Sequence, residues 1–168
     1  MTHSSETGAA MLSPDALAHI DKALEKYPAD QKKSAVMAAL TIAQDEKGYL
    51  STETMDFVAG RLGMPPVAVY EVASFYTMYD LAPVGKHKLC ICTNLPCALS
   101  GANEAARHLK EKLGIDWGET SPDGKFTLQE GECFGACGDA PVLLHNNKEM
   151  LIGMTPDALD RWLAEQAK

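Results

Sequence analysis

A strand and the helix that follows it are encoded by residues 87–113, HKLCICTNLPCALSGANEAARHLKEKL. The run 87–93 is short and mostly apolar, which predicts a buried strand. A helix is predicted over 98–113, with four small or apolar residues at helical spacing on its inward face: Ala102, Ala105, Leu109 and Leu113. Two cysteines, Cys92 and Cys97, lie between the core of the strand and the body of the helix. The stretch therefore predicts a βα unit that carries paired thiols where the strand ends.

Strand patterns dominate the chain after Gly114. Strands are predicted at 125–130, 141–145 and 148–152, with Asn146 and Asn147 as a hairpin turn, and a last helix is capped by Thr155 and buries Leu159, Trp162 and Leu163. A βα unit followed by a hairpin and a helix is typical of a thioredoxin-like α/β layer.

The first half of the chain has helical periodicity and no cysteine. Helices are predicted to begin at Ser13, Asp30, Ser51 and Pro65–Pro66. Their inward stripes are Leu17, Ile20, Leu24 and Tyr27; Val36, Leu40 and Ala43; Met55, Val58 and Leu62; and Val69, Val72 and Tyr76. Short connections between them predict a small helical bundle. The fold class expected is α+β, an N-terminal helical bundle followed by a thioredoxin-like α/β domain.

The boundary between these halves is marked by composition. All five cysteines lie between Cys90 and Cys137, and the segment 80–85 carries linker residues such as Pro83. We therefore predict a flexible tail over residues 1–12, a helical bundle domain over 13–82 and an α/β domain over 83–168.

Charge and hydropathy exclude several classes of partner. The net charge of −8 argues against nucleic acid, because phosphate binding needs a clustered basic face. There is no run of about 18 apolar residues for a membrane span, and residues 1–10 lack the apolar middle of a secretory signal. We expect a cytoplasmic protein with reduced thiols, so its five cysteines indicate metal or redox chemistry.

The cysteines form two spaced pairs. Four residues separate Cys92 from Cys97, and three separate Cys133 from Cys137. Four thiolates are the number that a [2Fe–2S] cluster needs, and its width tolerates looser spacing than a zinc knuckle. Structural zinc and thiol–disulfide chemistry remain alternatives at this point, although the Cys-x-x-Cys of thioredoxin-type redox proteins is absent. Cys90, two residues before Cys92, is expected to be a small buried hydrophobe.

The motif context carries a specific resemblance. The stretches ICTNLPC (91–97) and ECFGACGDAP (132–141), together with VASFYTMY (72–79) in the first half, resemble the small thioredoxin-like [2Fe–2S] subunits of bacterial NADH:quinone oxidoreductase (complex I). The same family includes the small, gamma-type subunits of NAD-dependent formate dehydrogenases and hydrogenases. The resemblance covers about residues 14–163.

The resemblance implies a cofactor and a partner. Its cysteine ligands match Cys92, Cys97, Cys133 and Cys137, which would hold one [2Fe–2S] cluster. It implies an electron-transfer role beside a larger subunit that binds FMN and NADH, in a complex peripheral to the inner membrane. A zinc-stapled adaptor and a free ferredoxin are the other function classes considered.

The sequence predicts no site for NADH or flavin in this chain, because its glycines do not form G-x-G-x-x-G. It predicts no catalytic residues either. The carboxylates near the second cysteine pair, Glu130, Glu132 and Asp139, are expected to be solvated. His87 and His145 are expected in surface or core roles, since four cysteines already fill the site. Arg107 and His108 are expected to be solvated.

Overall fold

The computed structural model describes residues 11–166, and the chain divides into two compact units between Pro83 and Val84. Residues 1–10 of the predicted tail lie outside the described residues. Leu12, by contrast, is 2% exposed and packs in the core of the first unit. Each unit has its own hydrophobic core, so each is described separately.

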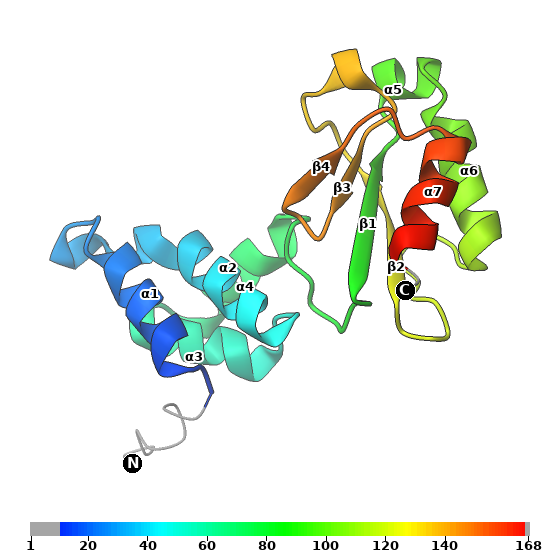
Figure 1. Ribbon diagram of the computed structural model, residues 1–168. Helices are drawn as coiled ribbons and strands as arrows, with labels where there is room; N and C mark the ends of the chain where they lie inside the picture. Colours follow the sequence, from blue (N-terminus) through cyan, green and yellow to red (C-terminus); the bar gives the residue numbers. More distant parts are fainter. Residues whose placement is uncertain (1–10, 167–168) are drawn as a thin grey trace. The chain divides into compact units, whose positions relative to one another are not determined.

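The first unit is helical throughout. It contains α1 (Pro14–Leu24), the 3-10 helix η1 (Ala29–Ala35), α2 (Val36–Lys47), α3 (Thr52–Leu62) and α4 (Pro66–Phe75) (Figure 1). Two predicted caps are confirmed, because the Ser13 hydroxyl accepts a hydrogen bond from the Ala16 amide and the Ser51 hydroxyl accepts one from the Thr54 amide. The core is built from residues at the predicted inward positions, among them Ile20, Leu40, Met55, Val58 and Val69.

Three helix predictions in this unit are wrong in detail. Tyr27 is not on the inward stripe of the first helix, because α1 ends at Leu24 and Tyr27 is 40% exposed. Asp30 does not cap α2, since residues 29–35 form a 3-10 turn in which Gln31 is non-helical, and α2 begins only at Val36. Tyr76 is not part of the α4 stripe: it follows the helix in extended conformation and is 40% exposed. Ala73, one turn after Val69, takes the buried position instead.

The second unit is a four-stranded sheet with helices. Its elements are β1 (His87–Cys92), α5 (Leu95–Leu99), α6 (Ala102–Leu113), β2 (Phe126–Gly131), the 3-10 helix η2 (Cys137–Asp139), β3 (Leu143–His145), β4 (Glu149–Leu151) and α7 (Pro156–Gln166). The strand order is β2-β1-β3-β4, with β1 and β2 parallel and the other pairs antiparallel. Figure 1 shows α6 and α7 against one face of this sheet. The predicted α+β fold class is confirmed.

The core of this unit lies between the sheet and its helices. It contains Leu89, Ile91, Leu109, Leu128, Leu143 and Leu159, all fully buried. The hairpin turn is confirmed, because Asn146 and Asn147 both have positive φ, as a two-residue β-hairpin turn requires. The single helix predicted over 98–113 is instead two helices. Gly101, with φ of 95°, separates α5 from α6, and a left-handed residue does not continue a helix.

Two parallel strands end side by side in this sheet. Cys92, the last residue of β1, lies opposite Gly131, the last residue of β2. The chain leaves both strands in the same direction, into the two loops that carry the cysteine pairs. This register brings together two sequence motifs that are about 40 residues apart.

Candidate metal centre

The first pair of cysteines is buried. Cys92 ends β1 and Cys97 lies in α5, and each is 1% exposed. They pack with Ala102 of α6 and with Val142, next to the partly buried Phe134, Ala136 and Ala140. The backbone amide of Cys92 also donates to the Val142 carbonyl at 3.1 Å. The inner side of the site is therefore lined by small apolar groups that exclude water.

The second pair is exposed. Cys133 follows β2, and Cys137 begins η2; both are open to solvent. Between them Gly135 has a φ of 78°, a conformation that glycine adopts without strain. Its amide donates a hydrogen bond to the Cys133 sulfur at 3.4 Å. The loop is thus bent so that a backbone N–H points at a cysteine sulfur.

The two pairs lie close enough to perturb one another. Burial raises the pKa of the Cys97 thiol above its ordinary value, and its neighbour Cys92 raises it further, while the Val142 amide opposes the rise by donating to the sulfur. Desolvation and then Cys133 raise the pKa of Cys137 in the same way. Cys137 also acts on Cys97, and Cys92 on Cys137. The structure therefore gathers all four predicted residues into one cluster of thiols.

These thiols form two neighbouring pairs, each within hydrogen-bonding reach internally. Among residues 11–166, no three His, Cys, Asp or Glu side chains converge on the space of a single metal ion. A [2Fe–2S] cluster takes two thiolates for each iron, so paired sulfurs with backbone N–H donors fit such a cluster. Bound iron would offset the raised pKa values of Cys97 and Cys137, because a cationic metal stabilises thiolates.

Cys90 is half-buried and points toward the neighbouring strand. A Cβ placed on Gly131 would lie 2.9 Å from the Cys90 sulfur and 2.4 Å from the ring of Phe134. Cys90 thus packs against the strand that leads to the second cysteine pair, rather than being fully buried as expected. Gly131 leaves room for that contact.

Two side-chain hydrogen bonds join the loop that follows β1 to the end of β2 and to the residue just after it. The Thr93 hydroxyl donates to Glu130 at 2.7 Å, and the Asn94 amide donates to Glu132 at 3.3 Å. These bonds lie at the surface, as predicted for both carboxylates, but no sequence pattern indicates their partners. Finding them needs the register of β1 on β2, which places Thr93 beside the end of β2.

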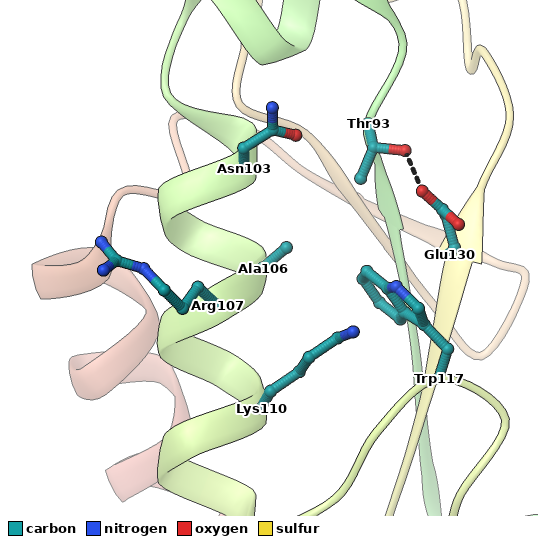
Figure 2. Close-up of a pocket in the computed structure, with 7 residues that line it drawn as sticks. All are labelled: Thr93, Asn103, Ala106, Arg107, Lys110, Trp117 and Glu130. Atoms are coloured by element: carbon teal, nitrogen blue, oxygen red, sulfur yellow. Dashed lines mark hydrogen bonds between the residues drawn. The ribbon is translucent and has the colours of Figure 1, made fainter.

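A pocket of about 320 Å³ opens beside the first of these bonds. Figure 2 shows Thr93 and Glu130 facing each other on one side of it, with Trp117 and Lys110 nearby. The Lys110 ammonium lies 4.1 Å from the centre of the Trp117 ring and pairs with Asp116. Asn103 and Arg107 of α6 also line the pocket. Arg107 is exposed, as expected.

The histidines lie away from the cysteines in the sheet. His87, at the start of β1, is buried and contacts His145 of β3, five residues along β1 from Cys92. Both histidines therefore keep the predicted interpretation, a role in the core or at the surface and not as cluster ligands. His108, expected to be solvated, instead pairs with Asp160 at 2.9 Å and holds the pKa of that carboxyl below its ordinary value.

Comparison with known proteins places the chain in a family. Residues 20–167 match the family model described as thioredoxin-like [2Fe-2S] ferredoxin.

The chain belongs to the thioredoxin-like [2Fe–2S] ferredoxin family.

This membership confirms the predicted cofactor, a [2Fe–2S] cluster, and the predicted thioredoxin-like fold of the second unit. Which residues hold the cluster stays a prediction, because the family match does not assign ligands.

Relatives of similar length carry a common name. The chain is 42% identical over 138 residues to the E subunit of NADH-quinone oxidoreductase from Rickettsia bellii (strain RML369-C), covering 82% of each chain. It is 46% identical over 124 residues to the E 2 subunit of the enzyme of that name from Rhizobium meliloti (strain 1021), covering 74% of this chain and 73% of the relative. A Dictyostelium discoideum relative, NADH dehydrogenase [ubiquinone] flavoprotein 2, is 44% identical, and the chain spans 53% of its length.

Solved structures support the fold. An NAD+-reducing [NiFe]-hydrogenase in the H2-reduced state aligns with a TM-score of 0.70 and 19% identity, over 79% of this chain and 22% of the hydrogenase chain. At that identity the likeness concerns the fold alone. Within residues 11–166, no helix has both the length and the apolar character needed to cross a membrane.

Proposed function

We propose that this chain serves for electron transfer in an NADH:quinone oxidoreductase (complex I), with one [2Fe–2S] cluster on Cys92, Cys97, Cys133 and Cys137. The observation that carries the proposal is the meeting of two cysteine pairs beyond the adjacent ends of β1 and β2. The names of the relatives support the choice of complex. The bound cluster supplies one-electron transfer, and the chain adds no catalytic group of its own.

In this proposal the protein holds the cluster between a buried pair of cysteines and a solvent-exposed pair. Burial of Cys92 and Cys97 among apolar side chains keeps water from the inner sulfurs. The exposed Cys133 and Cys137 bring the outer sulfurs to the surface, where a partner can approach. Amide donors from Gly135 and Val142 favour negative charge on the sulfurs. This arrangement suits electron exchange at the outer edge.

The partner in this proposal is the subunit that binds FMN and NADH. The helical unit supports such docking, because apolar side chains on α4 stay in solvent: Val67 is 63% exposed, Tyr70 50% and Phe75 77%. Apolar groups gathered outside a core commonly mark a protein interface. In this proposal the assembled complex is peripheral to the inner membrane on its cytoplasmic side.

The gamma-type subunit of an NAD-dependent formate dehydrogenase or hydrogenase is the alternative. Both assignments use the same cluster site, so the site does not separate them. Affinity purification of the tagged chain from its own cells separates them by the identity of the subunits that come with it. A quinone-reducing assembly supports complex I, and a nickel–iron or formate-oxidising subunit supports the alternative.

The ligand assignment is tested on the pure protein. We expect a brown chain with two irons and two acid-labile sulfides, and expect loss of both in each Cys→Ser variant at positions 92, 97, 133 and 137. Cys90→Ala is the matched control and should keep its colour. A colourless wild type that binds zinc would favour the adaptor alternative, and a colourless Cys90→Ala variant would overturn the ligand set.

A further inference from the structure

The strand ladder between β1 and β2 ends where the cysteine loops begin. The last backbone bond, from the Thr93 amide to the Gly131 carbonyl, is already long at 3.5 Å. Two side-chain bonds add to it at this end of the sheet: Thr93–Glu130 joins the loop after β1 to the end of strand β2, and Asn94–Glu132 joins the two loops. Thr93 and Asn94 directly follow Cys92, while Glu130 lies three residues and Glu132 one residue before Cys133.

We infer that these two side-chain bonds are positioning contacts that fix the separation between the Cys92–Cys97 pair and the Cys133–Cys137 pair. The inference rests on the proposed ligand set. A binuclear centre needs its two sulfur pairs at one set distance, and the second pair is exposed, on a loop whose Phe134 and Ala136 are only partly buried. A hydroxyl or amide donating to a carboxylate is a strong, directional contact for such a place.

The geometry distinguishes the two bonds. The Thr93–Glu130 bond is 2.7 Å long and lies at the wall of the pocket in Figure 2, where α6 covers one side of it. The Asn94–Glu132 bond is longer, at 3.3 Å, and Glu132 directly precedes Cys133. The first bond therefore anchors the end of β2, and the second acts on the ligand loop itself.

The Asn94–Glu132 bond can be reversed as a test. Asn94→Asp sets two carboxylates against each other and should loosen the loops. Asn94→Asp combined with Glu132→Gln restores a donor and an acceptor in swapped positions. We expect the single variant to shorten the half-life of the visible absorption under an iron chelator about threefold or more, the scale of one lost hydrogen bond. The double variant should recover the wild-type half-life.

The Thr93–Glu130 bond is tested by an isosteric change. Thr93→Val removes the hydroxyl and should shorten the half-life to a similar degree, whereas Thr93→Ser keeps it and should match wild type. The reduced proteins are also compared by EPR, since altered iron separation or ligand angle changes the g values and line width. Glu111→Gln, which removes a charge from an exposed position of α6, serves as the control.

The outcomes separate the two claims. Altered EPR and fast loss in Asn94→Asp, both restored in the double variant, support the inference. A wild-type cluster with unchanged half-life and EPR in Asn94→Asp and Thr93→Val overturns the inference and leaves the proposed function standing. If the wild type holds no iron, the proposed function fails and this inference fails with it. Should Thr93→Val not fold by far-UV circular dichroism, the swapped pair still decides.

Discussion

Nδ1 of His87 lies 3.1 Å from Nε2 of His145, and the two rings are stacked. Nδ1 of His145 in turn lies 3.1 Å from a Glu149 oxygen, and a carboxylate only accepts, so this nitrogen carries the proton. With a neutral His145 ring, His87 then donates to its Nε2. Its own Nε2 keeps a lone pair and has no hydrogen-bond partner within residues 11–166.

This chain of bonds predicts a stability that depends on pH. Protonating His87 would place a donor at its buried, unpartnered Nε2, and burial accordingly lowers the pKa of His87, with smaller contributions from His145, Lys86 and Lys125. Since the unfolded chain titrates near about 6.5, it takes up the proton first. We expect the thermal midpoint to fall as pH drops below about 6.5, and expect no contribution from this group above that pH.

The measurement compares wild type with His87→Phe, which keeps the stack on Phe126. The thermal midpoint of wild type minus that of His87→Phe should fall as pH is lowered from about 8 to about 5, a range that spans the unfolded-state pKa of histidine. Comparing the two proteins at each pH cancels the loss of stability that acid causes through the cluster, because that loss is common to both. His19→Phe, at an exposed position of α1, should track wild type. Parallel midpoint curves for wild type and His87→Phe would contradict the mechanism.

Gly131 predicts a steric effect at the second cysteine pair. A Cβ there would lie 2.4 Å from the Phe134 ring and 2.9 Å from the Cys90 sulfur. Gly131→Ala should therefore destabilise the protein by about 1–3 kcal/mol, as overpacking does, measured by chemical or thermal unfolding. Gly138→Ala, in η2 with no atom within 4 Å of its Cβ, is the matched control. Adding Phe134→Leu to Gly131→Ala should restore part of the stability; equal stability of the two single variants would refute the contact.

The two cores predict an autonomous cluster unit. The core of the helical unit is drawn from residues 12–79, and the cores around the sheet and the cysteines are drawn from residues 89–163. We predict that residues 84–168 fold and accept a cluster without the helical unit. Iron, sulfide and circular dichroism of the reconstituted fragment, set against the full chain, measure this. A fragment that folds only with residues 1–83 present would show one folding unit.

Charge near the cluster predicts its potential. Reduction adds negative charge, which Glu130 and Glu132 oppose, and all-cysteine ligation already favours a low value. We expect a midpoint below about −150 mV, the lower edge of histidine-ligated centres. Glu130→Gln should raise it by about 20–40 mV, the scale of 0.5–1 kcal/mol for one exposed charge. An EPR-monitored titration checks both values, with Glu111→Gln as the control that should leave the midpoint in place.

Local features of the fold were predictable from the sequence, because their signals lie within a few residues. Ser13 and Ser51 cap helices as expected, and Asn146–Asn147 forms the turn. Gly101 was a missed local signal, since a glycine inside a helical pattern often marks a break. Pro96, near the start of α5, pointed to the same division.

Features that depend on register were not predictable. The bond from Thr93 to Glu130 joins residues 37 positions apart and exists only because β1 and β2 pair in parallel with Cys92 opposite Gly131. The same holds for His87 and His145, which are 58 positions apart and meet through the pairing of β1 with β3. The spacing within each cysteine motif likewise does not predict which of the two pairs is buried.

The unequal burial of the two cysteine pairs sets a direction for biogenesis. A protein that delivers a preformed cluster must bring it within reach of a receiving thiol, and of the four proposed ligands only Cys133 and Cys137 stand in the open. On the proposed ligand set, we expect Cys92 and Cys97, each 1% exposed, to bind the cluster after Cys133 and Cys137. Oxidants and chelators should likewise reach the exposed sulfurs first, so we expect assembly and loss of the cluster to begin at the same pair of cysteines.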